Sequence, residues 1–159
     1  MGDRTWLQLT IRKDDINKVN EIFGYDLCDA ELNEPDNTSV TGYYDEVNYG
    51  GSEELEELAY SGITFIAQHG SGGGYGAYEI VCFLGEQQSS EIGYEGGFVV
   101  ETHYEDGEVI ISKDSLSRIK NWYRIENLAR KHLDNCQEPE FLAEVAKRRL
   151  TKGMNLENT

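Results

Sequence analysis

Residues 98–112, FVVETHYEDGEVIIS, place Asp106-Gly107 between two runs rich in β-branched and aromatic residues. Asp-Gly at such a position is a strong signal for a two-residue hairpin turn. We therefore predict strands over Phe98–Tyr104 and Glu108–Ser112. After Ser112 the apolar spacing becomes helical, so this stretch separates a strand-rich N-terminal part from a helical C-terminal part.

Two helices are predicted after the hairpin. In the first, Asp114 or Ser115 is the expected N-cap, and apolar residues recur at helical spacing as far as Leu133. Pro139 suits the start of the second helix. Basic residues in this segment could contact nucleic acid, pair with the acidic block of a second copy in a homodimer, or simply be solvated. We favour the last two interpretations for Arg130, Lys131, Lys147, Arg148, Arg149 and Lys152.

Strands and short helices alternate before the hairpin. Alternation predicts a strand over Thr5–Arg12, and runs rich in apolar and aromatic residues predict strands over Val40–Tyr49, Ile63–Gln68 and Ala77–Leu84. Helical spacing predicts one helix that starts after Asp14 or Asp15 and ends at Gly24, and another over Glu53–Ser61 with Ser52 as N-cap. We expect Tyr25–Ser39 to be an acidic loop with room for a short irregular strand. Gly85–Gly97 is expected to be a polar, acidic connection.

This order predicts an α+β fold with one mostly antiparallel sheet and two short helices in the N-terminal two-thirds, followed by a C-terminal helical hairpin. The expected organisation is an acidic α+β domain over 1–112, a two-helix segment over 113–153 packed on the same domain, and a flexible tail over 154–159. No apolar run approaches the length of a membrane span. The three cysteines, Cys28, Cys82 and Cys136, are far apart in the sequence, which favours free thiols in a reducing cytoplasm.

The acidity of the chain lies in one block. Val19–Ser112 contains 20 Asp and Glu residues and no Lys or Arg, although the whole chain has 14 basic residues and a net charge of −16. Such a surface repels nucleic acid and anionic lipid, so we expect no direct contact with nucleic acid or membrane. No closely spaced set of Asp residues resembles a calcium loop, and we predict neither a metal site nor a cofactor.

The glycine-rich segment His69–Gly76, HGSGGGYG, and two histidines are the candidates for chemistry. The segment is followed by a strand pattern and has no lysine nearby, unlike a phosphate-binding loop, so a flexible connection or an adaptable contact loop with Tyr75 at its tip is favoured. His69 and His103 each lie near the end of a predicted strand and could be neighbours in space. They are the candidate catalytic residues of a small enzyme, although neither has a metal-binding spacing.

Tyrosines and carboxylates together suggest a binding surface. Nine of the ten tyrosines lie within the acidic block. Aromatic side chains surrounded by carboxylates suit contact with a basic surface, because the aromatic groups supply contact energy and the charges steer association. The predicted partner-binding residues are Asp26, Asp29, Glu31, Glu34, Asp36, Tyr43, Tyr44, Asp45, Glu46, Glu53, Glu54, Glu56, Glu57, Tyr75, Glu105, Asp106 and Glu108.

The sequence favours a non-enzymatic protein whose partner is a basic protein that handles nucleic acid. In this hypothesis the carboxylates replace phosphates and occlude the partner's basic surface, as in DNA-mimic, anti-restriction, anti-CRISPR or nuclease immunity proteins of phages and other mobile elements. Its expected location is the cytoplasm of the host cell. The alternatives are the small enzyme above and a structural or regulatory module that oligomerises through the C-terminal helices.

Overall fold

The computed structural model describes residues 3–34 and 36–157, with side chains as far as Lys152. Six strands form one sheet in the order β2-β3-β1-β4-β5-β6, and all neighbouring strands are antiparallel. The strands are β1 (Arg4–Arg12), β2 (Cys28–Leu32), β3 (Ser39–Asn48), β4 (Phe65–His69), β5 (Ala77–Phe83) and β6 (Glu86–Ile92). Two helices, α1 (Ile16–Phe23) and α2 (Ser52–Tyr60), complete a βαββαβ arrangement of the ferredoxin-like type, which β5 and β6 extend at one edge.

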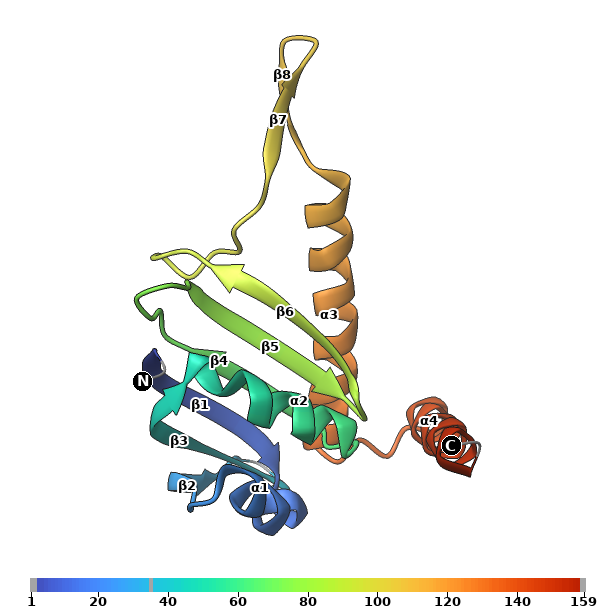
Figure 1. Cartoon of the computed structure of the whole chain (residues 1–159). Coiled ribbons are helices and arrows are strands. Elements are labelled where there is room, and N and C mark those ends of the chain that lie inside the picture. Colours follow the sequence, from blue (N-terminus) through green and yellow to red (C-terminus); the bar gives the residue numbers. More distant parts are fainter. Residues whose placement is uncertain (1–2, 35, 158–159) are drawn as a thin grey trace.

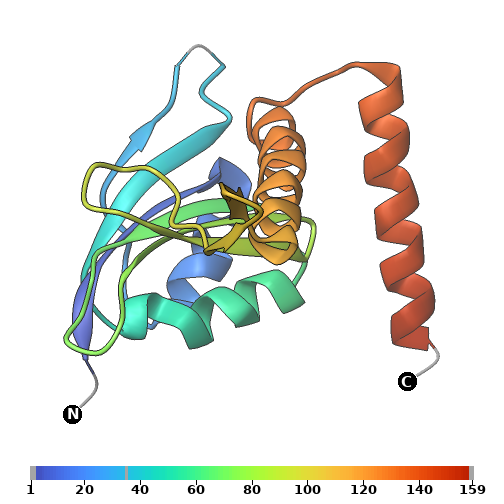
Figure 2. The ribbon, with the colours of Figure 1, turned by 90° about the horizontal axis from the view of Figure 1, so that it is seen from above.

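One face of the sheet is covered by α1 and α2 (Figure 1, Figure 2). Strand β1 alternates strictly, so that Leu7, Leu9 and Ile11 are fully buried on this face and the residues between them are not. The two helices contribute Val19 and Leu58, among others, to the same hydrophobic cluster. Helix α1 ends at Gly24 in the left-handed conformation with φ +82°, as predicted.

The opposite face of β4, β5 and β6 is covered by α3 (Lys113–Leu133). Trp122, Ile125 and Ala129 pack with Val81 and Phe83 in a second hydrophobic cluster. Arg12 Nη1 donates a 2.7 Å hydrogen bond to the carbonyl oxygen of His132, and Thr38 Oγ1 donates one of 2.7 Å to that of Leu133. These bonds satisfy the last carbonyls of α3 and connect the helix to the N-terminal half of the chain.

Helix α4 (Pro139–Glu157) lies beside the β5–β6 turn. Figure 1 shows α3 from the side and α4 along its axis, so the two helices cross. Phe141 and Val145 join the cluster around Phe83, and the Arg148 guanidinium lies 4.8 Å from the centre of the Phe83 ring. The predicted tail, 154–159, begins within this helix, and residues 158 and 159 lie outside the described residues.

Glu86 connects this region electrostatically. Its carboxylate accepts hydrogen bonds from Arg124 of α3 and Arg148 of α4, and Arg148 also pairs with Glu144 at 2.8 Å. Burial alone would raise the pKa of Glu86, but the two arginines outweigh it and the pKa is lowered. Lys152 Nζ donates to the carbonyl oxygen of Tyr60 at 2.9 Å. Several cations of the predicted basic cluster therefore have partners within the chain.

The predicted fold class is confirmed: a mostly antiparallel sheet, short helices in the N-terminal part and two C-terminal helices. The largest correction is β6, which lies where a polar connection was expected over Gly85–Gly97. Its turn, Leu84-Gly85, has φ values of +48° and +98°, and leucine gives no sequence signal for such a conformation. Ser112, rather than Asp114 or Ser115, caps α3, because its side chain accepts a hydrogen bond from the Ser115 amide.

Candidate functional site

The predicted Asp-Gly hairpin is present as β7 (Thr102–Glu105) and β8 (Glu108–Ile111), and it projects from the body (Figure 1). We call residues 101–111 the β7–β8 arm; every one of them is exposed. The arm is attached only near its base in the described structure, where the Glu101 amide donates to Ser115 Oγ at 2.9 Å and the Ser112 amide donates to the Glu101 carbonyl oxygen at 2.8 Å. Arg118 supports the segment before the arm by donating a 2.7 Å hydrogen bond to the carbonyl oxygen of Val99.

The two faces of the arm differ chemically. The register pairs Thr102 with Ile111 and Tyr104 with Val109, and directly opposed residues share one face of a hairpin. One face therefore carries Tyr104, Val109 and Ile111, and none of these side chains is covered: Tyr104 is 75% exposed and Val109 72%. The arm is an amphipathic hairpin whose apolar face has no partner among the described residues.

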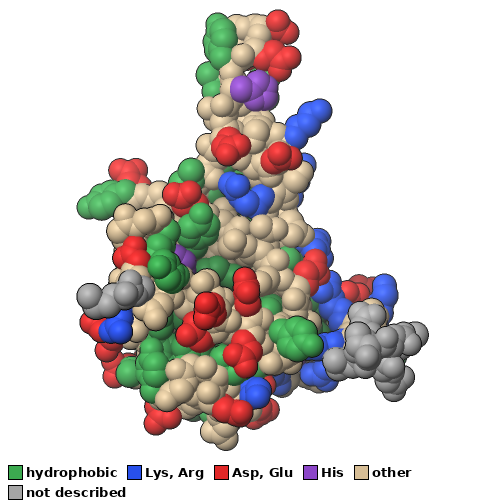
Figure 3. Space-filling model, in the orientation of Figure 1, with side chains coloured by type: hydrophobic (Ala, Val, Ile, Leu, Met, Phe, Trp, Pro, Cys, Tyr) green, Lys and Arg blue, Asp and Glu red, His purple; other side chains and the backbone are tan. Residues whose placement is uncertain are grey.

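The other face of the arm is acidic. It carries the opposed pair Glu105 and Glu108, together with Ile110 and His103, whose Nε2 lies 3.3 Å from a Glu105 oxygen. Asp106 lies in the turn between them, and the arm contains no Lys or Arg. Figure 3 shows acidic, histidine and hydrophobic side chains together at this projecting end. Carboxylates directly opposite each other repel, so the arm carries an electrostatic cost that a bound cation would relieve.

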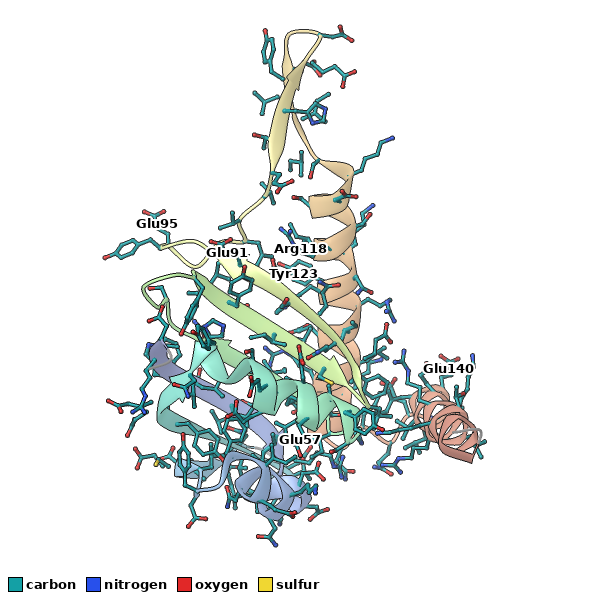
Figure 4. The ribbon with its side chains drawn as sticks, viewed as in Figure 1. Glu57, Glu91, Glu95, Arg118, Tyr123 and Glu140 are labelled. Atoms are coloured by element: carbon teal, nitrogen blue, oxygen red, sulfur yellow. The ribbon has the colours of Figure 1, made fainter. Side chains whose placement is uncertain are left out.

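The remaining predicted carboxylates lie on three other parts of the fold. Those from Asp26 to Asp36 are exposed on the edge strand β2 and its flanking loops, whereas Glu53, Glu54, Glu56 and Glu57 lie on α2. Asp45 and Glu46 are exposed on β3, where Glu46 pairs with Arg4 at 3.0 Å. In Figure 4, Glu57 of the predicted set lies on α2, apart from two acidic residues outside that set, Glu95 and Glu140. The carboxylates are thus distributed among regions rather than collected on one face.

Tyr44 was predicted to contact a partner, but this prediction is wrong because its side chain is fully buried. Its ring stacks on Phe23 with centroids 4.1 Å apart, and Tyr25 packs edge-on against it. Burial raises the pKa of Tyr44. The neighbouring Tyr43 is exposed on the opposite face of β3, where its hydroxyl accepts a 3.1 Å hydrogen bond from Gln8 Nε2.

The structure does not bring His69 and His103 together: His69 ends β4 in the large sheet, while His103 belongs to the arm. His69 is instead buried beside three tyrosines. Its ring centre lies 5.6 Å from that of Tyr75 and 5.7 Å from that of Tyr78, and Tyr49 lies 6.0 Å from Tyr75. These rings line a cavity of about 510 Å³ between α2 and the β5–β6 strands, which we call the tyrosine pocket.

Two glycines allow these rings to approach. Gly50 has φ +66°, and a Cβ atom there would lie 2.4 Å from Cδ2 of His69. A Cβ atom on Gly72 would lie 2.6 Å from the Tyr75 ring. Such distances are well inside van der Waals contact, so a larger residue at either position would displace a wall of the pocket. Gly50 and Gly72 thus leave room for Tyr75 to pack edge-on against His69, a role that the glycine-rich composition alone does not reveal.

The glycine-rich segment is fastened to the N-terminus. Asp3 Oδ2 accepts a 2.7 Å hydrogen bond from the Gly74 amide, and the Tyr75 hydroxyl donates to the Asp3 carbonyl oxygen at 3.1 Å. Tyr75 is therefore half-buried against the pocket rather than presented at a loop tip, which corrects its predicted position.

Sequence reasoning missed Tyr49 and Tyr78 as pocket residues and the apolar face of the arm. The consecutive apolar residues Val109, Ile110 and Ile111 were a usable signal, because a strand that is apolar on both sides requires cover on both sides.

Within the described residues no group of three or more His, Cys, Asp or Glu side chains could hold a metal ion. No helix in that part of the chain is both long enough and apolar enough to cross a bilayer.

Comparisons with protein-family models, with curated proteins and with solved structures found no match to this chain.

Proposed function

We propose that this protein is a non-enzymatic inhibitor that binds a basic protein surface through the β7–β8 arm and thereby occludes a site for nucleic acid. The proposal includes the anti-defence and immunity roles expected from the sequence: the partner is an enzyme that handles DNA or RNA. The single observation that carries it is the amphipathic character of the projecting arm.

The apolar face of the arm supports a protein partner. An isolated two-stranded hairpin is marginal in water, and exposing Tyr104, Val109 and Ile111 on it contributes nothing to the stability of the free chain. Apolar residues on a projecting element are typical of a surface that becomes covered on association. Tyrosine is also among the residues that contribute most to binding energy at interfaces.

The acidic face supports a basic partner. The arm exposes four acidic side chains and contains no Lys or Arg. The four are Glu101, Glu105, Asp106 and Glu108. A basic surface would be attracted over a distance of about 8–10 Å at ordinary salt, and a cation between Glu105 and Glu108 would relieve their repulsion. A second copy of this chain is a poorer partner, because association would bring together two molecules of net charge −16.

Site-specific photocross-linking in the native host tests the proposal. A photoreactive phenylalanine analogue replaces Val109 on the arm, and the matched control carries it at Leu150 of α4, which is 70% exposed against 72% for Val109. We expect Val109 to give a discrete adduct with a basic nucleic-acid-handling enzyme, and Leu150 to give none with that enzyme.

The purified pair then provides the mechanistic test. Affinity should fall steeply with salt, and excess inhibitor should prevent the enzyme from binding its nucleic acid. An adduct only with a second copy of this chain, an acidic partner, or an affinity that is unchanged from low to high salt would contradict the proposal.

A further inference from the structure

The tyrosine pocket is separate from the arm and has the features of a built site. Tyr49, Tyr75 and Tyr78 supply aromatic walls, while Leu55 of α2 and Ile80 of β5 supply apolar lining. At about 510 Å³ the cavity is large enough for an extended side chain or a small molecule.

His69 offers an acceptor to this pocket. The residue is 6% exposed, and its Nδ1 lies 2.7 Å from the carbonyl oxygen of Gly70. A carbonyl only accepts, so Nδ1 carries the proton and Nε2 of the neutral ring is an acceptor. Burial lowers the pKa of His69, which keeps the ring neutral at pH 7. Nε2 has no hydrogen-bond partner among the described residues, so a ligand with an N–H donor would satisfy it.

The charge of the pocket determines which sign of ligand charge it favours. Glu56 lines it and forms no ion pair within the described residues, and no Lys or Arg lines it. Ser52 and Gln87 add side-chain oxygens that can accept hydrogen bonds. An anionic ligand such as a phosphate would meet a carboxylate and the negative faces of three tyrosines, whereas a cation is favoured by both.

We propose that the tyrosine pocket binds the guanidinium group of arginine. A guanidinium is planar and stacks on aromatic rings, and its five N–H donors can reach acceptors on several sides at once. His69 Nε2, the Glu56 carboxylate and the side-chain oxygens of Ser52 and Gln87 supply such acceptors. A lysine ammonium has three donors on a compact, strongly hydrated group and matches this arrangement less well.

The guanidinium could belong to free arginine or to an arginine side chain displayed on a protein. In the second case the inference rests on the proposed function, because the arginine would lie on the same basic partner that the arm contacts. The pocket then contributes specificity for arginine-rich surfaces.

Titration of the full chain with N-acetyl-L-arginine amide, followed by NMR of the His69 and tyrosine ring signals, tests the proposal. We expect saturable shifts with a dissociation constant on the order of 1 mM or tighter. The matching citrulline compound has the same shape without the charge, and it should bind at least about tenfold more weakly, which corresponds to about 1.4 kcal/mol. The lysine compound should also bind more weakly.

Matched variants locate the binding. Glu56→Gln and Glu57→Gln make the same change in net charge on neighbouring residues of α2, but only Glu56 lines the pocket. Tyr75→Leu has its control in Tyr60→Leu, because Tyr60 is exposed on α2 and lies outside the pocket. We expect the two pocket variants to weaken arginine binding several-fold and the two controls to leave it unchanged.

Three outcomes would overturn the inference: no shift of these signals at saturating arginine compound, equal affinity for the citrulline compound, or equal losses in Glu56→Gln and Glu57→Gln. A peptide with a single arginine distinguishes the two sources, since it should bind more tightly than the free compound if the natural ligand is a protein side chain. If the arginine compound fails while the Val109 cross-link succeeds, the pocket inference falls and the proposed function stands. If the arginine compound binds while the Val109 cross-link fails, the pocket inference stands for free arginine and the proposed function falls.

Discussion

The hairpins β5–β6 and β7–β8 follow each other in the chain and turn in the same way, but their surroundings are opposite. Leu84 and Gly85 have φ values of +48° and +98°, and Asp106 and Gly107 have +52° and +85°. Two positive φ angles in a two-residue loop are the mark of a type I′ turn, whose twist matches that of paired strands. The turns therefore do not explain the difference between the hairpins.

The two hairpins differ in whether other elements of the chain cover their side chains. In β5–β6, α3 and α4 bury Val81 and Phe83 completely, and Glu86 at the turn is paired with two arginines. In the β7–β8 arm the apolar residues are exposed and the carboxylates beside the turn have no arginine or lysine partner within the described residues. The first hairpin has its partners within the chain, and we interpret the second as having them on another molecule.

Loss of core contacts in β5–β6 should give the largest effect on stability. Phe83→Ala removes a fully buried ring from between α3 and α4, and we expect it to lower the free energy of unfolding by about 4 kcal/mol. Val109→Ala in the arm should change it by less than about 0.5 kcal/mol. Urea unfolding of both variants measures the contrast, and similar losses in the two would show that the arm is part of the core.

Acidification should lower the free energy of unfolding by nearly as much, through a histidine that packs against β5–β6. His132 packs edge-on against Phe83, its Nδ1 lies 2.7 Å from Thr64 Oγ1, and burial together with Arg12 and Arg149 lowers its pKa from 6.5 to about 4. The unfolded state therefore takes up a proton first, so this contribution to stability is complete above about pH 6.5 and is lost as the pH falls toward 4. Over that range the loss is about 3 kcal/mol.

The His132→Gln variant isolates this contribution from the titration of the many carboxylates. Its free energy of unfolding should fall less between pH 7 and pH 4 than that of the unchanged chain, by about 3 kcal/mol. Equal pH dependence in the two proteins would show that folding does not lower the pKa of His132.

The ion pairs at the β5–β6 turn should contribute less. Glu86→Gln weakens the bonds from Arg124 and Arg148, and because these groups are partly exposed we expect a loss of only about 1 kcal/mol in unfolding free energy. Glu57→Gln, with no ion pair within the described residues, is the control and should be neutral. A double-mutant cycle with Arg148→Met measures the coupling energy between Glu86 and Arg148. A value near zero would show that this ion pair does not stabilise the β5–β6 turn.

Substitutions in the arm should have the smallest effects on stability, but they should weaken binding to the partner. Glu105→Gln removes the repulsion from Glu108 and should leave the chain unchanged or more stable by a few tenths of a kcal/mol. Tyr104→Ala should also leave stability nearly unchanged. Both should weaken binding to the partner, Tyr104→Ala by about tenfold or more, as measured by calorimetry. Normal affinity in both variants would place the contact elsewhere.

Much of this fold was predictable because local signals agreed with the final structure. The alternation in Leu7, Leu9 and Ile11 identified β1, Gly24 marked the end of α1, and Asp106-Gly107 marked the arm. Strand β6 was missed for two reasons. Its sequence, EQQSSEI, is polar because it lies at an edge of the sheet, and Leu84 adopts a conformation that only the surrounding structure enforces.

The candidate sites were less predictable, because they depend on contacts between distant segments. His69 and Tyr75 were identified as individual residues, but their meeting with Tyr49 and Tyr78 requires α2 and β4–β6 to be in place. The burial of Tyr44 depends likewise on the position of Phe23 in α1. Charge composition identified the arm's carboxylates, while the uncovered apolar face beside them follows only from the register of β7 with β8.

Amide hydrogen exchange on the full chain, alone and with the enzyme recovered by cross-linking, tests most directly whether the arm is the binding element. In the free chain we predict rapid exchange in the β7–β8 arm and exchange limited by global unfolding around Val81 and Phe83. On complex formation the arm amides should slow by about tenfold or more while those of β5–β6 are unchanged. Arm amides that are already as protected as β5–β6 in the free monomer, or that exchange equally fast in the complex, would contradict the account.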